Sequence, residues 1–321
     1  MLRSSLILAL SAVPALAQVP RVVADLPVAQ SLVAQVMGEL GTPELLLDRG
    51  ADPHSVQLRP SQARALAGAG LVVWTGEGMS PWLEEPVSTL AGGRVLDLDA
   101  VEGLYQQGFL SSALLDEDGN DDHEEEGHDD HDEHGHEGHD HGHDHGAVDP
   151  HLWLDPQNAA TWLRAIAAEL SSLDPANAGP YAANAEAAVA RTQALQAEVA
   201  AILAPVGDAG LVMFHDAYGY FVTVYGLNVL GTVTLGDAAA PGAARLSGLR
   251  AGLEAAGAVC LFPEVNHPAD FAELVIEGTG VRLGAPLDPA GVMLEPGAGL
   301  YGDLMRGLAT AKRYRFVLRI L

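Results

Sequence analysis

The residues with the clearest chemical potential are three histidines that lie far apart in the sequence. His54 follows a predicted strand at 44–47 through a short loop, and His215 directly follows a predicted strand at 211–214. His151 lies just after a long acidic and His-rich stretch. Ligands of open α/β sheets bind beyond the carboxyl ends of the strands, so these imidazoles could meet in one cleft.

Three imidazoles completed by a carboxylate or a water form a tetrahedral zinc set. Asp288, which follows a strand-like run at 281–283, is the candidate carboxylate, and capping of that strand end is the alternative role. Nitrogen donors favour Zn²⁺ over Mn²⁺. Each imidazole must be neutral to bind, so affinity should fall as the pH drops through the imidazole range. The spacing alone fits core or capping histidines equally well.

A second metal-binding signal is the segment 116–146, which consists almost entirely of Asp, Glu, Gly and His. It lacks apolar residues to offset chain entropy, so we predict a disordered inserted loop. Alternating imidazoles and carboxylates on such a chain bind transition metals, more weakly than a preformed cleft because binding orders the chain. This suits a collector or sensor of zinc, and a solvated acidic tract is the alternative. Its accessory ligands would be His123, His128, His131, His134, His136, His139, His141, His143 and His145.

The N-terminus predicts export. A basic start, an apolar run at 6–16 and an Ala15-Leu16-Ala17 site indicate a secretory signal peptide over 1–17, with cleavage after Ala17. We therefore expect a soluble periplasmic protein. Its net charge of -27, to which 116–146 contributes 15 acidic residues and no Lys or Arg, argues against nucleic-acid binding and attracts cations.

The elements that must position these residues alternate between strands and helices. This rhythm predicts an α/β fold with a parallel sheet in each half. Strands are predicted at 21–25, 44–47, 71–75, 94–98, 211–214, 227–230, 259–262 and 281–283. Helices are predicted at 28–37, 61–69, 156–173, 181–203, 243–256, 269–277 and 298–309. The helix at 181–203 fits a connection between two lobes, or an ordinary surface helix of one lobe.

At this point the sequence resembles the zinc-specific solute-binding proteins of ABC importers, which are ZnuA-like. The resemblance covers nearly all of the mature chain. It rests on GADPH at 50–54, LVVWTG at 71–76, DPHLWLDP at 149–156, FHDAYGYF at 214–221 and the acidic His-rich loop before the second ligand motif.

The resemblance implies two lobes, each with a mainly parallel sheet flanked by helices, joined by a single long helix with the metal in the cleft. It implies Zn²⁺ as the transported ligand, His54, His151 and His215 as ligands, and Asp288 near the metal. The partner would be a membrane permease with a cytoplasmic ATPase, and the zinc-binding protein itself would be a monomer. The expected domains are the signal peptide 1–17, an N-terminal lobe 18–176 with the loop 116–146, a connecting helix 177–204 and a C-terminal lobe 205–321.

The chain departs from the family pattern at several places. Members often pair a cysteine at the position of Cys260 with one near the C-terminus, but the basic end at 311–321 has none, so Cys260 is interpreted as a buried hydrophobe. Some members place a Glu directly before the first ligand histidine, and here that place is Pro53. Water, Asp288 or a loop histidine could fill the fourth position. His267 is expected to be a surface or supporting histidine rather than an accessory ligand. Glu264 is expected to orient a ligand histidine or to have a structural role.

We expect capture and release of zinc, not catalysis. The alternatives are a manganese- or iron-binding member of the same family, a periplasmic zinc buffer in which only the loop matters, and a zinc hydrolase. The hydrolase is disfavoured because the sequence has no H-E-x-x-H or similar general-base motif.

Overall fold

The structure is a computed structural model that describes residues 19–110, 148–233, 243–267 and 269–311. The predicted signal peptide and the nine loop histidines lie outside the described residues, as does most of the basic C-terminus. No helix among the described residues combines the length and apolarity needed to cross a membrane.

The first lobe is built on a four-stranded parallel sheet with the order β2-β1-β3-β4. Its central strands are buried runs of Val, Ala, Leu and Trp, as expected for strands covered on both faces. The strands are β1 (Val22–Ala24), β2 (Glu44–Leu45), β3 (Leu71–Trp74) and β4 (Arg94–Asp97). The helices are α1 (Pro27–Met37), α2 (Pro60–Ala67) and α3 (Glu84–Leu90).

The second lobe repeats this arrangement with the order β6-β5-β7-β8, again all parallel. The two lobes thus share one topology, although the sequence shows no close internal repeat. The strands are β5 (Leu211–Met213), β6 (Val229–Thr232), β7 (Cys260–Phe262) and β8 (Arg282–Leu283). The helices are α6 (Gly219–Tyr225), α7 (Ala243–Ala255), α8 (Ala269–Ile276) and α9 (Leu300–Ala311).

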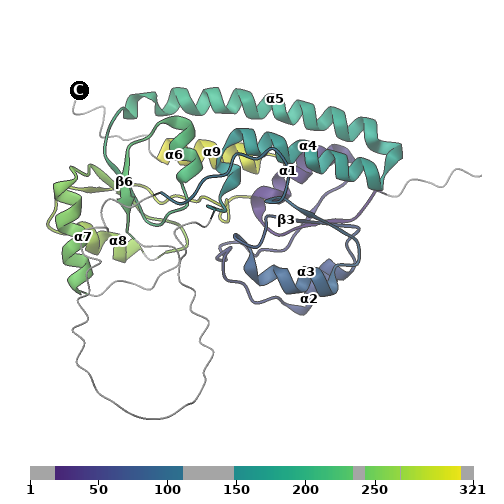
Figure 1. Ribbon diagram of the computed structural model, residues 1–321, viewed down its shortest axis with the longest axis horizontal. Coiled ribbons are helices and arrows are strands. Elements are labelled where there is room, and N and C mark those ends of the chain that lie inside the picture. The colour runs from purple at the N-terminus through teal and green to yellow at the C-terminus, as the bar shows by residue number, and fades with distance from the viewer. Residues whose placement is uncertain (1–18, 111–147, 234–242, 268, 312–321) are drawn as a thin grey trace, which may run out of the picture.

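Two long helices lie between the two sheets along the chain, α4 (Pro156–Leu173), which packs on α1, and α5 (Ala178–Leu203). Helix α5 has 26 residues, about 39 Å at 1.5 Å per residue, and spans both lobes (Figure 1). The predicted break between them occurs at Asp174, whose Oδ2 accepts hydrogen bonds from Asn177 and Tyr181. The prediction of two α/β lobes joined by one long helix is confirmed. Short 3-10 turns lie at Gly38–Leu40, Pro81–Leu83, Leu152–Leu154, Pro175–Asn177 and Ala204–Val206.

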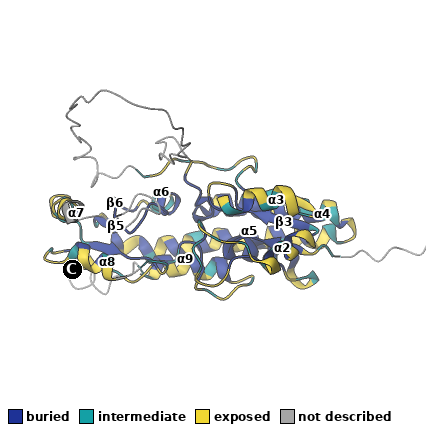
Figure 2. Ribbon diagram, turned by 90° about the horizontal axis from the view of Figure 1, so that it is seen from below, coloured by how far each residue is buried: buried dark blue, intermediate teal, exposed yellow. Residues whose placement is uncertain are grey.

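The lobes share one apolar core that follows α5. The largest buried cluster extends from β1 through α1, α4, α5 and α9 to β5, and Figure 2 shows buried faces along this line. Helix α9, although it follows the second sheet, packs on α1 and α5. Its start is fixed by the Tyr301 backbone N–H, which donates to Ser31 Oγ at 3.0 Å. The chain therefore crosses back to the first lobe, and the domain boundaries drawn from the sequence remain a prediction.

Candidate metal centre

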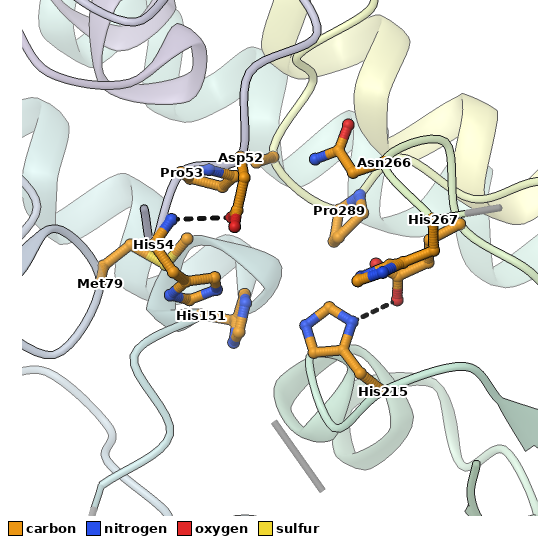
Figure 3. Close-up of a pocket in the computed structure, with 11 residues that line it drawn as sticks. Asp52, Pro53, His54, Met79, His151, His215, Asn266, His267 and Pro289 are labelled. Carbon is orange, nitrogen blue, oxygen red and sulfur yellow. Dashed lines mark hydrogen bonds and ion pairs between the residues drawn. The ribbon is translucent and has the colours of Figure 1, made fainter. Parts of the chain in front are cut away.

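Three histidines from distant parts of the chain meet between the lobes. One ligand atom from each of His54, His151 and His215 lies within 4.8 Å of the other two. The ring centroids are 5.6 Å apart for His54 and His151, 5.7 Å for His151 and His215, and 6.4 Å for His54 and His215. Figure 3 shows the three rings turned toward a common space. Three neutral imidazoles at this separation can bind one tetrahedral metal ion and leave a fourth position open.

His54 is positioned by a loop that follows β2. Its backbone N–H donates to Asp52 Oδ1 at 2.9 Å, which fixes the turn before the histidine. The carbonyl oxygen of Pro53 accepts from Trp82 Nε1 at 2.9 Å. The loop is also tied to the C-terminal region, because Gly50 N–H donates to Val292 O at 3.0 Å. His54 is partly exposed, and its backbone is anchored at both sides.

His151 is positioned by the motif at 149–156. Asp149 is fully buried, and its Oδ1 accepts from the His151 backbone N–H at 3.0 Å and contacts His151 Nδ1 at 2.8 Å. Six residues later, Asp155 caps α4 by accepting from Gln157 N–H at 2.8 Å. Between them, Trp153 Nε1 donates to Pro289 O at 2.8 Å. The two aspartates thus act as turn and helix caps on either side of a buried aromatic anchor, which fixes the His151 ring.

His215 follows β5 and is oriented by a carboxylate from the neighbouring strand. Glu264 follows β7, which pairs with β5, and its Oε1 contacts His215 Nδ1 at 2.6 Å. The same oxygen accepts from Tyr218 Oη at 2.9 Å. Burial raises the pKa of Glu264, but His215, through its hydrogen bond and through its charge when it is protonated, together with Tyr218 and His267, holds this pKa below its usual value.

Two of the three imidazoles therefore direct Nδ1 at a buried carboxylate. A neutral imidazole that donates its Nδ1–H in this way presents the Nε2 lone pair on the opposite side, and the carboxylate raises its basicity as a ligand. Asp149 and Glu264 perform this role for His151 and His215. Both histidines are thus prepared as nitrogen donors.

The surroundings of the trio are strongly acidic. Burial and the negative charge of Asp149 raise the pKa of Asp216 to about 7, although the positive charge of His215 and the Leu110 backbone oppose the shift. Asp216 is therefore partly protonated near neutral pH, and the negative charge that attracts cations comes mainly from Glu264, whose pKa is lowered.

Asp288, the candidate fourth ligand, is not part of the trio or of any other metal-compatible group among the described residues. Its Oδ1 accepts from Val292 N–H at 2.9 Å and its Oδ2 from Met293 N–H at 2.8 Å. Both oxygens thus hold the turn that follows the Leu-Asp-Pro sequence. The pocket itself is lined by Asp52, Pro53, His54, Met79, His151, His215, Glu264, Asn266, His267, Pro289 and Ala290.

Sequence reasoning did not assign a role to Asp149 as the partner of His151. The Asp-x-His spacing at 149–151 was a usable signal, because an Asp two residues before a histidine can bond both its backbone and its ring. Tyr218 as a partner of Glu264 carried no such signal, since the two lie 46 residues apart.

The chain is similar to known proteins in both sequence and fold. Residues 22–311 match the family described as ZnuA, zinc-uptake complex component A, periplasmic. The chain is 49% identical over 316 residues, 96% of both chains, to the high-affinity zinc uptake system protein ZnuA of Paracoccus denitrificans. A zinc-bound ZnuA deletion mutant is similar in fold, with a TM-score of 0.68 and 23% identity over 90% of this chain and 95% of that chain. A Mn²⁺ complex of the solute-binding protein FpvC from Pseudomonas aeruginosa has a TM-score of 0.70 and 24% identity over 91% of this chain and 98% of that one.

Proposed function

The chain belongs to the ZnuA family of periplasmic zinc-uptake components, and from this membership we propose that it captures Zn²⁺ for an ABC importer. In this proposal one ion is held in the periplasm by His54, His151 and His215 and delivered to a membrane permease that is driven by a cytoplasmic ATPase. The observation that carries the proposal is the convergence of the three imidazoles to within 4.8 Å. The protein acts by capture and release, without covalent chemistry.

Zinc is the cargo that suits these donors best. Three nitrogen ligands form the open, four-coordinate set of Zn²⁺, whereas Mn²⁺ prefers oxygen-rich, octahedral sites. The fold alone does not select the metal, since a similar fold is found in a Mn²⁺ complex. We assign the fourth position to water rather than Asp288, because Asp288 belongs to no metal-compatible group among the described residues and its two oxygens hold the turn that follows it.

Release of the ion follows from the division of its three ligands between the two lobes. His54 belongs to the first lobe, His151 precedes α4, which packs on α1, and His215 follows β5 of the second lobe. A small movement of the second lobe on the permease would withdraw one of three ligands. An ion that loses one nitrogen exchanges it for water and dissociates more readily.

The test is competition of the full chain with a zinc chelator of known affinity, for the wild type and for His54→Ala, His151→Ala and His215→Ala. We expect one tight site that each substitution removes, and displacement of Zn²⁺ by Mn²⁺ only at large excess. Deletion of 116–146 should leave the tight site in place. Tight binding that survives the three substitutions but not the deletion would favour a loop-based zinc buffer instead.

A further inference from the structure

A second group of metal-compatible side chains adjoins the first and shares a residue with it. One ligand atom each from His215, Glu264 and His267 lies within 4.8 Å of the other two. We propose that this outer trio is a second, alternative position for Zn²⁺, occupied before the ion passes to the inner trio of His54, His151 and His215. The inference rests on the proposed function, because it concerns the path of the same ion.

The turn that carries Glu264 and His267 is held firmly in place. The segment forms a parallel bridge with the chain that follows β8, between Glu264 and Leu287. Leu287 N–H donates to Pro263 O at 2.8 Å, and Val265 N–H donates to Leu287 O at 3.0 Å. The His267 N–H closes the turn by donating to Glu264 O at 3.3 Å. The two side chains are therefore held at a fixed spacing by the backbone.

The His267 ring is also held in place from its face. It stacks on Phe214 with a centroid distance of 4.4 Å and an interplanar angle of 25°. Phe214 immediately precedes His215, so the stacking places the His267 ring beside the His215 ring, with their centroids 6.0 Å apart. A ring held by its face keeps its nitrogens at the edge, and Figure 3 shows the His267 ring beside His215.

Each trio has two buried members and one partly exposed histidine, which is His267 in the outer trio and His54 in the inner one. His215 and Glu264 are only 7% and 4% exposed, whereas His267 is partly exposed. Two imidazoles and a carboxylate with an open position form a known zinc ligand set. A hydrated ion that enters the cleft on the side of the second lobe would meet the partly exposed His267 first and would lose only part of its water shell at the outer trio.

The shared residue sets the relation between the two positions. Because His215 belongs to both trios, an ion can move inward by exchanging Glu264 and His267 for His54 and His151. The move transfers the ion from Nδ1 of His215, which faces Glu264, to Nε2, and the ring proton moves from Nε2 to Nδ1, where Glu264 accepts its hydrogen bond. Simultaneous occupancy would require one imidazole to bridge two divalent cations as its anion. The two positions are therefore alternatives for a single ion, with the three-nitrogen inner trio as the final one.

Crystals of the full chain grown with Zn²⁺, with anomalous difference maps at the zinc edge, test the proposal. The wild type should show the ion at the inner trio, and His54→Ala should move it to the outer trio. Adding His267→Phe, which keeps an aromatic ring on Phe214 but removes the nitrogens, should abolish the outer peak. An ion that stays between His151 and His215 in His54→Ala, no ion in that variant, or an outer peak that survives His267→Phe would each overturn the outer position. Absence of the inner peak in the wild type would instead refute the proposed function.

A kinetic measurement separates a ligand role of His267 from a packing role. If the outer trio lies on the path, His267→Phe in the otherwise native chain slows zinc binding and zinc release by the same factor and leaves Kd unchanged. Stopped-flow mixing with a fluorescent zinc chelator measures both rates. Rates equal to those of the wild type, as expected if His267 only packs on Phe214, would contradict the proposal.

Discussion

Replacing Asp149 by Asn tests whether the buried carboxylate behind His151 tunes zinc affinity. Asp149 is fully buried and contacts only the backbone and ring of His151 among the three candidate ligands. Asn has the same shape, and its carbonyl oxygen can still accept both N–H groups. The substitution therefore removes the negative charge while the position of the ring is retained.

The expected loss follows from the kind of hydrogen bond involved. A bond to a charged group contributes about 1.5–3 kcal/mol and a neutral one about 0.5–1.5 kcal/mol, so the Nδ1 contact at 2.8 Å should weaken by roughly 1–1.5 kcal/mol. Loss of such an outer partner typically reduces metal affinity about 10- to 100-fold, or about 1.4–2.7 kcal/mol. We therefore expect zinc affinity near the lower end of that range, about tenfold weaker.

Chelator competition at neutral pH, on the full chain, measures this change. Asp155→Asn is the matched control from the same motif, because Asp155 caps α4 and makes no contact with a ligand histidine. The control should bind zinc as the wild type does, since Asn is as good a helix cap as Asp. Equal affinities of the wild type, Asp149→Asn and Asp155→Asn would refute the orienting role of Asp149.

Three further predictions concern stability. Burial, Asp97 and Glu77 raise the pKa of Asp99 from 3.8 to about 7, so the stability that protonated Asp99 contributes is present below about pH 4 and is lost as the pH rises toward 7. In thermal unfolding, Asp99→Asn should therefore have the same Tm as the wild type at pH 4 and a higher Tm above pH 7. An equal change in Tm at both pH values would contradict this. Asp25 is buried and accepts hydrogen bonds from Leu26, Thr75 and Ser80. Asp25→Ala should therefore lower the free energy of unfolding, measured by urea titration, by about 2–4 kcal/mol. A loss below about 0.5 kcal/mol, which is the range of an ordinary surface substitution, would contradict a stabilising role of these hydrogen bonds. Free zinc at 100 times Kd should stabilise the chain by about 2.7 kcal/mol, and chelation should reverse the Tm increase; an unchanged Tm would exclude tight binding to the folded state.

The fold was predictable because its signals are local and repeated. The apolar runs before His54 and His215, the Asp-Pro break between α4 and α5 and the caps around His151 each specify a nearby structure. The shared order of the two sheets was not predictable, because strand order depends on crossovers rather than on any local pattern. The packing of α9 on α1 was also not predictable, because an apolar helical face does not specify which element it packs against.

The sequence was sufficient to predict the three candidate ligands, but not the residues that orient them. His54, His151 and His215 were the histidines outside the His-rich segment whose neighbours formed recognisable motifs, and the structure brings them together. Asp288 was expected near the metal from its motif, but the turn at 288–293 engages both of its oxygens. The sequence predicts a supporting rather than a ligating role for His267, whereas its place beside His215 and Glu264 in a second metal-compatible group indicates a ligand.

The central claim is that one zinc ion is bound by three imidazoles between the lobes. A crystal structure of the wild-type chain loaded with a single equivalent of Zn²⁺, with the ion located by anomalous scattering, tests it most directly. The account predicts one ion at about 2.0–2.1 Å from a nitrogen of each of His54, His151 and His215. A single ion bound anywhere else, or one that contacts fewer than three of these rings, would contradict it.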